Sequence, residues 1–136
     1  MKKPEDYGIT NYKWSKEGLL DVDGDVNLND KGLDKLPFKF GKVSGGFDCW
    51  KNQLVSLEGA PKTVGGNFDC SYNKLKTLEG APKEVGGNFD CSYNKLKTLE
   101  GAPKFVKGKI IVDDNLENQI PYYINVNQVI DYLMED

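Results

Sequence analysis

The chain has no histidine among its 136 residues, and its charges nearly cancel. Without histidine it lacks the commonest general base, the commonest metal ligand, and the base of Ser-His and Cys-His nucleophile pairs. The 18 basic and 21 acidic residues leave a net charge of −3, so no basic field attracts nucleic acid directly. We therefore expect no enzyme, no catalytic residue, no cofactor and no direct contact with nucleic acid.

Long apolar runs are also missing. No stretch approaches the roughly 20 apolar residues that a membrane span requires. The N-terminal "MKKPEDYGIT" has two lysines but no apolar segment of the kind found in signal peptides. We therefore expect a cytoplasmic protein without a membrane partner, and the length predicts a single domain over residues 1–136.

What the chain does contain is a repeat. The segment "NFDCSYNKLKTLEGAPK" occurs identically at residues 67–83 and 88–104, and a looser copy, "GFDCWKNQLVSLEGAPK", occupies residues 46–62. The resulting step of 21 residues relates three sets: Cys49, Cys70 and Cys91; Asn52, Asn73, Asn94 and Asn115; and Phe47, Phe68, Phe89 and Ile110. We predict about five coils over residues 22–120, with degraded copies at both ends, as terminal repeats usually are.

Each unit carries the pattern F-x-C-x-x-N-x-L-x-x-L. The alternation in "FDC" predicts a short half-buried strand, and the two leucines are expected to point inward. The Asn after the strand is expected to bond backbone groups of neighbouring coils. One coil cannot bury its apolar edge alone, whereas stacked coils bury a continuous one. The fold class predicted is mainly β, as a short solenoid.

The flanks predict two caps for the ends of this solenoid. Residues 1–21 contain aromatic and apolar side chains around "SKEG", which predicts a hairpin-like N-terminal cap. Residues 121–136 place four apolar side chains at helical spacing, which predicts a C-terminal α-helical cap: Val126, Val129, Ile130 and Leu133. Without such lids a solenoid exposes strand edges and apolar side chains.

The unit resembles the leucine-rich repeat, with Phe and Cys in place of the first two leucines. The stretch "DVDGDVNLNDKGLDKLPFKFGKVSGGFDC", with the "LEGAPK" and "VGG" segments that follow, is similar to a family of small leucine-rich-repeat-like proteins of tailed bacteriophages. The resemblance covers roughly residues 19–110. It implies a leucine-rich-repeat-like solenoid of viral origin that acts in an infected bacterial cell, and it implies no catalytic residue.

Three features of the chain have residue types found in chemical sites, and each is better explained by structure. The cysteines share one repeat position, so they form a single inward column of small apolar side chains and not a tetrahedral zinc site. The acids of "DVDGD" lack the final Glu of a calcium loop, and the "VGG" segments lack the pattern of a phosphate loop. We therefore expect no metal ligands, although whether the acidic residues bind a cation is left open.

The remaining feature is the strand face between the inward residues, which the resemblance makes concave. Its predicted partner-binding residues are acidic or aromatic, with one lysine: Asp48, Trp50, Lys51, Asp69, Tyr72, Asp90, Tyr93, Asp113 and Asp114. Carboxylates about 5 Å apart repel by roughly 0.8 kcal/mol in water and about 3 kcal/mol at a dielectric near 20, so the Asp row does not help folding. Trp50 departs from Ser in the exact copies, so duplication did not place it there.

These features predict a protein–protein interaction module. With the resemblance, they favour a phage protein that binds and inhibits a host protein, such as a defence component, possessing a basic surface. Two alternatives stay open: a structural protein of the virion, and an acidic mimic of nucleic acid that blocks a nucleic-acid-binding protein. The sequence also leaves homo-oligomerisation open.

Overall fold

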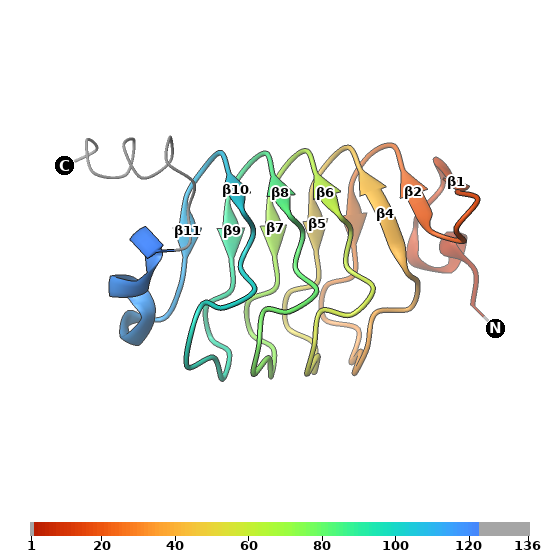
Figure 1. The fold of residues 1–136 in the computed structure, drawn as a ribbon. Coiled ribbons are helices and arrows are strands. Elements are labelled where there is room, and N and C mark those ends of the chain that lie inside the picture. The colour runs from red at the N-terminus through yellow and green to blue at the C-terminus, as the bar shows by residue number, and fades with distance from the viewer. Residues whose placement is uncertain (1, 123–136) are drawn as a thin grey trace.

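The computed structural model describes residues 2–122, which wind into a β-solenoid of about four turns with little helix (Figure 1). Two sheets form its layers, and we call them sheet A and sheet B. Sheet A has the strand order β1-β2-β4-β6-β8-β10, and sheet B has the order β11-β9-β7-β5-β3. The prediction of a mainly β solenoid is confirmed, and the structure supports about four turns where the sequence suggested five coils.

The strands are short, because each coil turns sharply between the two sheets. Sheet A contains β1 (Tyr12–Trp14), β2 (Leu20–Val22), β4 (Phe40–Val43), β6 (Thr63–Val64), β8 (Glu84–Val85) and β10 (Phe105–Val106). Sheet B contains β3 (Val26–Asn27), β5 (Phe47–Asp48), β7 (Phe68–Asp69), β9 (Phe89–Asp90) and β11 (Ile110–Ile111). Two 3-10 helices, η1 (Pro4–Tyr7) and η2 (Asp114–Tyr122), lie at opposite ends of the described chain.

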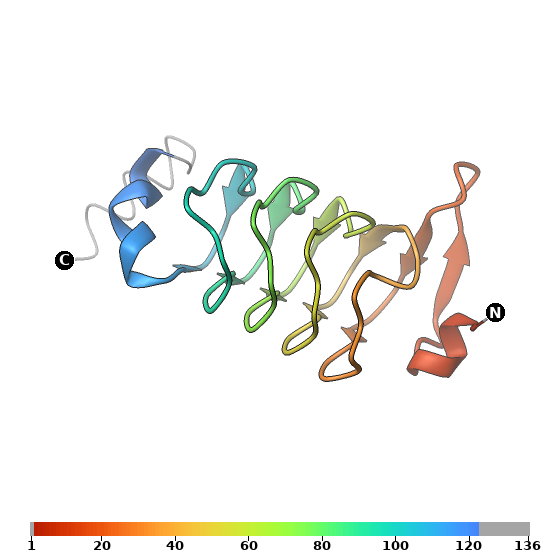
Figure 2. The ribbon, with the colours of Figure 1, turned by 90° about the horizontal axis from the view of Figure 1, so that it is seen from below.

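Residues that are 21 positions apart in the sequence pair with each other on neighbouring strands of both sheets. In sheet B, Phe68 pairs with Phe89 and Asp69 with Asp90, and in sheet A Val64 pairs with Val85. These pairings are parallel because successive coils run in the same direction, and Figure 2 shows the coils side by side from below. Each repeat position therefore becomes a row of side chains that crosses the strands.

The core consists of inward rows. The rings of Phe47 and Phe68 stack at 5.4 Å and those of Phe68 and Phe89 at 5.6 Å, and all three side chains are fully buried. Such aromatic pairs stabilise a fold by about 0.5–1.5 kcal/mol each beyond their burial. Further buried rows share one residue type each: Cys49, Cys70 and Cys91; Leu54, Leu75 and Leu96; Leu57, Leu78 and Leu99; and Val43, Val64, Val85 and Val106.

The predicted asparagine ladder ties the coils together. The Asn73 amide donates to the carbonyl oxygens of Cys49 (3.0 Å) and Cys70 (3.1 Å), and its Oδ1 accepts from the Leu54 N–H (3.0 Å). Asn52 and Asn94 bond their neighbours in the same way. The turn after each sheet B strand contains buried backbone groups that no strand pairing satisfies, and the Asn side chains provide their hydrogen-bond partners.

Glycine permits the tight return between the sheets. Gly80 has φ +94°, and a Cβ there would lie 2.9 Å from the Leu57 carbonyl oxygen of the preceding coil. A Cβ on Gly87 would lie 2.9 Å from the carbonyl carbon of Gly66. A side chain at either position would push neighbouring coils apart, so the glycines of "EGAP" and "VGG" set the close stacking.

The two ends of the solenoid depart from the repeat. Strand β1 pairs antiparallel with β2, so a hairpin extends sheet A, and the Tyr12 hydroxyl donates to the carboxylate of Glu5 in η1 at 2.8 Å. At the other end, Leu116 of η2 is buried, and the Gln119 Oε1 accepts from the Leu99 N–H at 3.0 Å. Asn115, which the repeat placed in the ladder, is exposed. The helix predicted for residues 121–136 falls almost wholly outside the described residues.

Candidate functional site

The acidic row of the predicted contact face lies on the outer side of sheet B. The Phe and Cys side chains on either side of each Asp point inward and are buried. Asp48, Asp69 and Asp90 between them are partly exposed and follow one another in register across β5, β7 and β9. Alternation along a strand produces this separation, as the sequence predicted.

The aspartates also hold the turns of their own coils. The Asp69 Oδ1 accepts from the Ser71 N–H at 2.9 Å and from the Ser71 hydroxyl at 2.6 Å, and Asp90 bonds Ser92 in the same way. Ser71 and Ser92, at the repeat position where the looser copy has Trp50, are consequently buried. Part of what was predicted to be a free surface therefore belongs to the scaffold.

Asp48 has a different environment, because the looser copy has Trp50 where the others have Ser. Its Oδ1 accepts from the Trp50 N–H at 3.0 Å, and its Oδ2 accepts from the side-chain amide of Asn29 at 2.9 Å. In the looser copy a side chain of the neighbouring coil thus bonds the second carboxylate oxygen, whereas in the exact copies the Ser hydroxyl adds a second bond to Oδ1.

An aromatic row runs beside the aspartates. The rings of Tyr72 and Tyr93 stack at 4.4 Å with 11° between their planes, and Trp50 meets Tyr72 edge-on at 6.1 Å. Tyr72 and Tyr93 remain 47% and 61% exposed, whereas Trp50 is half-buried. The Lys51 ammonium lies 5.7 Å from the centre of the Trp50 ring, within cation–π range.

The two tyrosines of the aromatic row sit on strained backbone, at a repeat position that Lys51 occupies in the looser copy. Lys51, Tyr72 and Tyr93 have φ angles of 56°, 56° and 55°, and Asp30 occupies the same position one coil earlier at 51°. The left-handed conformation costs an ordinary side chain about 1–2 kcal/mol. The Asn ladder and the Asp–Ser bonds next to this position hold the turn in place, so the tyrosine rings are presented in one orientation.

The pKa of Asp69 reflects its position in the middle of the aspartate row. Burial raises the pKa of Asp69 above its ordinary value, the bonds from Ser71 oppose this, and the charges of Asp48 and Asp90 raise it further. The direction agrees with the expectation that stacked carboxylates do not assist folding. A cation near Asp69 would reverse the effect.

The last two predicted contact residues lie at the end of sheet B. The Asp113 Oδ1 accepts from the Tyr93 N–H at 2.7 Å, which ties the final turn to the preceding coil. Asp114 begins η2 and is exposed. The structure thus brings six of the nine predicted residues into two continuous rows: Asp48, Asp69 and Asp90, and Trp50, Tyr72 and Tyr93.

A hollow of about 510 Å³ opens on this same face. It is lined by polar residues of three coils, including Asp25, Asn27, Asp48, Asn67 and Asp69. Gly46, which also lines this hollow, occupies the repeat position that Asn67 and Asn88 fill in the next coils.

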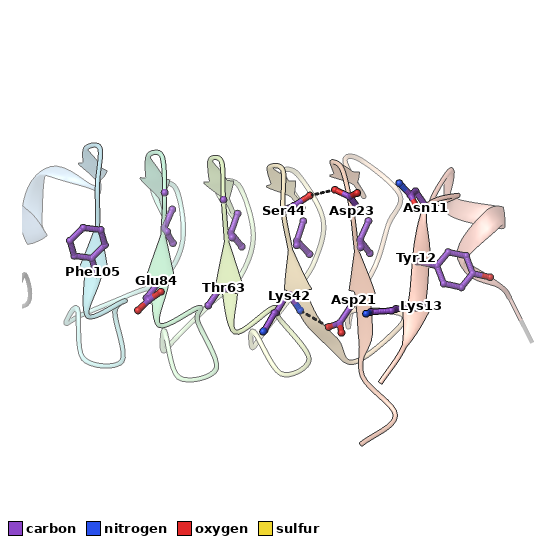
Figure 3. A pocket seen from close by; sticks show the side chains of 16 residues that line it. Asn11, Tyr12, Lys13, Asp21, Asp23, Lys42, Ser44, Thr63, Glu84 and Phe105 are labelled. Carbon is purple, nitrogen blue, oxygen red and sulfur yellow. Dashed lines mark hydrogen bonds between the residues drawn. The ribbon is translucent and has the colours of Figure 1, made fainter. Parts of the chain in front are cut away.

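A larger groove, of about 800 Å³, lies on the outer side of sheet A and was not predicted. Figure 3 shows the side chains that follow one another across its strands: Lys13, Asp21, Lys42, Thr63, Glu84 and Phe105. The Lys42 N–H donates to the Asp21 carboxylate at 2.9 Å, and the Ser44 hydroxyl donates to Asp23 at 2.8 Å. A signal was present in the sequence, since this repeat position is occupied by a different residue in every coil.

The cysteines lie in the core and form no disulfide. Burial raises the pKa of each thiol, that of Cys91 to about 12, so the thiols are protonated at neutral pH. Within residues 2–122, no group of three or more Cys, Asp or Glu side chains is placed to hold a metal ion. In the same range, no helix is long and apolar enough to cross a bilayer.

The chain was compared with known protein families, curated proteins and solved structures, and none of the three comparisons found a match.

Proposed function

We propose that this protein is a non-catalytic protein–protein interaction module whose contact surface is the outer face of sheet B. The observation that carries the proposal is the rigid pairing of two rows, the carboxylates of Asp48, Asp69 and Asp90 beside the stacked rings of Tyr72 and Tyr93. Aromatic side chains dominate binding energy at protein interfaces. A surface held in place before binding loses little entropy on association.

The partner we infer is a host protein with a basic surface. A basic patch would neutralise the Asp row, whose mutual repulsion and partial burial are reflected in the raised pKa of Asp69. The bacteriophage resemblance makes the partner a bacterial protein, and a defence component that the module inhibits in the cytoplasm of the infected cell is the sharpest form of the proposal. In this proposal the β1–β2 hairpin and a helix in residues 121–136 close the ends of a leucine-rich-repeat-like solenoid.

Affinity purification from a bacterial lysate, followed by mass spectrometry, tests the proposal. The triple variant Trp50→Ala, Tyr72→Ala, Tyr93→Ala should lose the partner that the unaltered protein recovers, because it removes the aromatic row. A matched control, Glu58→Ala, Lys76→Ala, Lys97→Ala, changes three exposed residues elsewhere and should retain the partner. Circular dichroism must show both variants folded. Equal recovery by all three proteins would refute the role of this face.

Two alternatives predict different results in the same system. A virion component would be detected by mass spectrometry in purified particles, whereas an inhibitor would occur only in infected cells. A nucleic-acid mimic would bind a nucleic-acid-binding protein with an affinity that falls steeply with added salt. A partner retained at high salt through aromatic contacts favours the interaction module.

A further inference from the structure

The repeat position that changes in every coil lies in the groove of sheet A. The identical segments at residues 67–83 and 88–104 are followed by Glu84 and by Phe105, respectively. In the two preceding coils the same repeat position holds Lys42 and Thr63. The register pairs Lys42 with Thr63, Thr63 with Glu84, and Glu84 with Phe105. Four side chains of four chemical kinds thus form one row across neighbouring strands (Figure 3).

Folding makes little use of this row. Lys42 bonds Asp21 through its backbone N–H only. Within residues 2–122, neither the Lys42 ammonium nor the Glu84 carboxylate takes part in an ion pair or a side-chain hydrogen bond. Phe105 is 39% exposed, although its ring is large and apolar. A cation, an anion and an apolar ring are therefore presented in order along a groove of about 800 Å³, and Asp21 and Lys13 continue the succession beyond Lys42.

The shape and the pairing of sheet A restrict what can occupy this groove. The strands that carry Lys42, Thr63 and Glu84 are already paired on both sides, so an incoming peptide cannot add itself as a strand at these positions. An extended peptide lying across them would leave its own backbone groups without partners. An α-helix satisfies its backbone internally and is convex, as helix-in-groove recognition requires.

The spacing of the row also fits a helix. Neighbouring strands are about 4.8 Å apart, and one turn of an α-helix rises about 5.4 Å. Over the three steps from Lys42 to Phe105 the two repeats differ by about 2 Å, which the long side chains of Lys42 and Glu84 can take up. Successive turns of a helix laid across the strands would therefore meet successive coils.

We propose that the groove of sheet A is a second docking site, and that its occupant is an amphipathic helix of a partner protein. One face of that helix carries an acidic residue opposite Lys42, a basic residue two turns further on opposite Glu84, and an apolar residue one turn beyond it against Phe105. The order of charges in the groove selects the helix. This inference does not depend on the face of sheet B, because the two surfaces share no residue.

The test uses the full chain, labelled with nitrogen-15, and two synthetic helical peptides of about 18 residues on an alanine-rich background. The matched peptide has Glu at one position, Lys seven residues later and Leu four residues after that. The exchanged peptide interchanges Glu and Lys and has the same composition. Titration followed by NMR measures the affinity and shows which backbone amides move.

We expect the matched peptide to bind about tenfold more tightly than the exchanged one, a difference of about 1.4 kcal/mol. The shifted amides should include those of residues 42, 63, 84 and 105. The double variant Lys42→Glu, Glu84→Lys should reverse the preference, because it reverses the order of charges. The variant Tyr72→Ala on the opposite sheet should leave the preference unchanged.

Three results would overturn the proposal: equal affinity for the two peptides, no shift up to millimolar peptide, or shifts centred on sheet B. The double variant changes exposed side chains only, so its thermal unfolding should stay close to that of the unaltered protein. A folded double variant that keeps the original preference would likewise reject the assignment of Lys42 and Glu84. None of these results bears on the pull-down test of the sheet B face.

Discussion

The two outer faces of this solenoid come from the same repeat but use their polar side chains differently. On sheet B, Asp69 and Asp90 recur in register and bond the Ser that follows two residues later. On sheet A, the corresponding outward position holds Lys42, Thr63, Glu84 and Phe105. The comparison shows that the repeat keeps the side chains that stabilise each coil by hydrogen bonds. The residue type changes at outward positions whose side chains form no such bonds.

The largest expected effect comes from the ladder that supports sheet B. Asn73→Ala should lower the free energy of unfolding by about 3 kcal/mol, because it leaves the buried Leu54 N–H without a partner and removes one of the two Asn bonds to each of the Cys49 and Cys70 carbonyl oxygens. Urea unfolding followed by circular dichroism measures the change. Asn94→Ala should cost less, since Asn94 is only half-buried. A loss below about 1 kcal/mol for Asn73→Ala would mean that the ladder is not what binds the coils.

The return path between the faces should be nearly as sensitive. Gly80→Ala is expected to cost about 2 kcal/mol, because φ is +94° and the new Cβ would lie 2.9 Å from the Leu57 carbonyl oxygen. The matched control is Gly18→Ala, which shares a positive φ of +80° but meets nothing within 4 Å. Comparing their midpoints in urea separates backbone strain from the clash between coils. Equal losses would show that coil stacking does not depend on Gly80.

A smaller effect of opposite sign is expected for the acidic row. Asp69→Asn keeps an oxygen to accept from Ser71 and removes a charge lying between Asp48 and Asp90, so it should stabilise the protein by about 0.5 kcal/mol at pH 7. Asp69→Ala, the control, also loses the acceptor and should destabilise it.

The pH dependence of the Asp69 effect has a definite sign. A carboxyl whose pKa is higher in the folded state contributes full stability below its unfolded pKa, and this contribution is lost as pH rises through the folded pKa. The advantage of Asp69→Asn should therefore appear as the pH rises above 3.8, the ordinary value, and vanish below it. Unfolding free energies of both proteins between pH 3 and 7 measure it. An advantage that grows toward low pH would contradict the raised pKa.

The smallest effect should come from sheet A. Thr63→Ala removes a side chain of the groove that the coil does not need, so it should change the unfolding free energy by less than about 0.5 kcal/mol. The same urea experiment provides the number. A loss as large as that of Asn73→Ala would erase the contrast between the two faces, because sheet A would then also be built from scaffold residues.

Much of the architecture was readable from particular residues. The columns Phe47–Phe68–Phe89 and Cys49–Cys70–Cys91 predicted inward rows, and the structure buries them. Asn52, Asn73 and Asn94 were predicted to bridge coils, and they do. The asparagine ladder does not extend to Asn115, because the chain leaves the repeat there and enters η2. In η2 the side chain of Gln119 bonds the preceding coil instead.

The candidate site was predicted less completely. Alternation placed Asp69 outside correctly, and Tyr72 is exposed as expected of a residue between Cys70 and Asn73, but the pattern could not tell that Ser71 would turn its hydroxyl to Asp69 and become buried. Such local bonds depend on the backbone conformation of the turn, which a pattern of apolar and polar letters does not encode. The groove was missed for a different reason: its outward position holds Lys42, Thr63, Glu84 and Phe105 in successive coils, so no recurring residue type marked it as a row.

The amino-acid order alone established that coils stack, how many residues each coil spans, and which side chains point inward, because all three follow from a period of 21 and the burial of apolar rows. The tertiary structure decided which outward side chains form hydrogen bonds within the solenoid and which remain available to contact a partner. That division arises only when neighbouring coils come within hydrogen-bonding distance, and it sets Asp69, bonded to its own turn, apart from Glu84, which stands in an open groove.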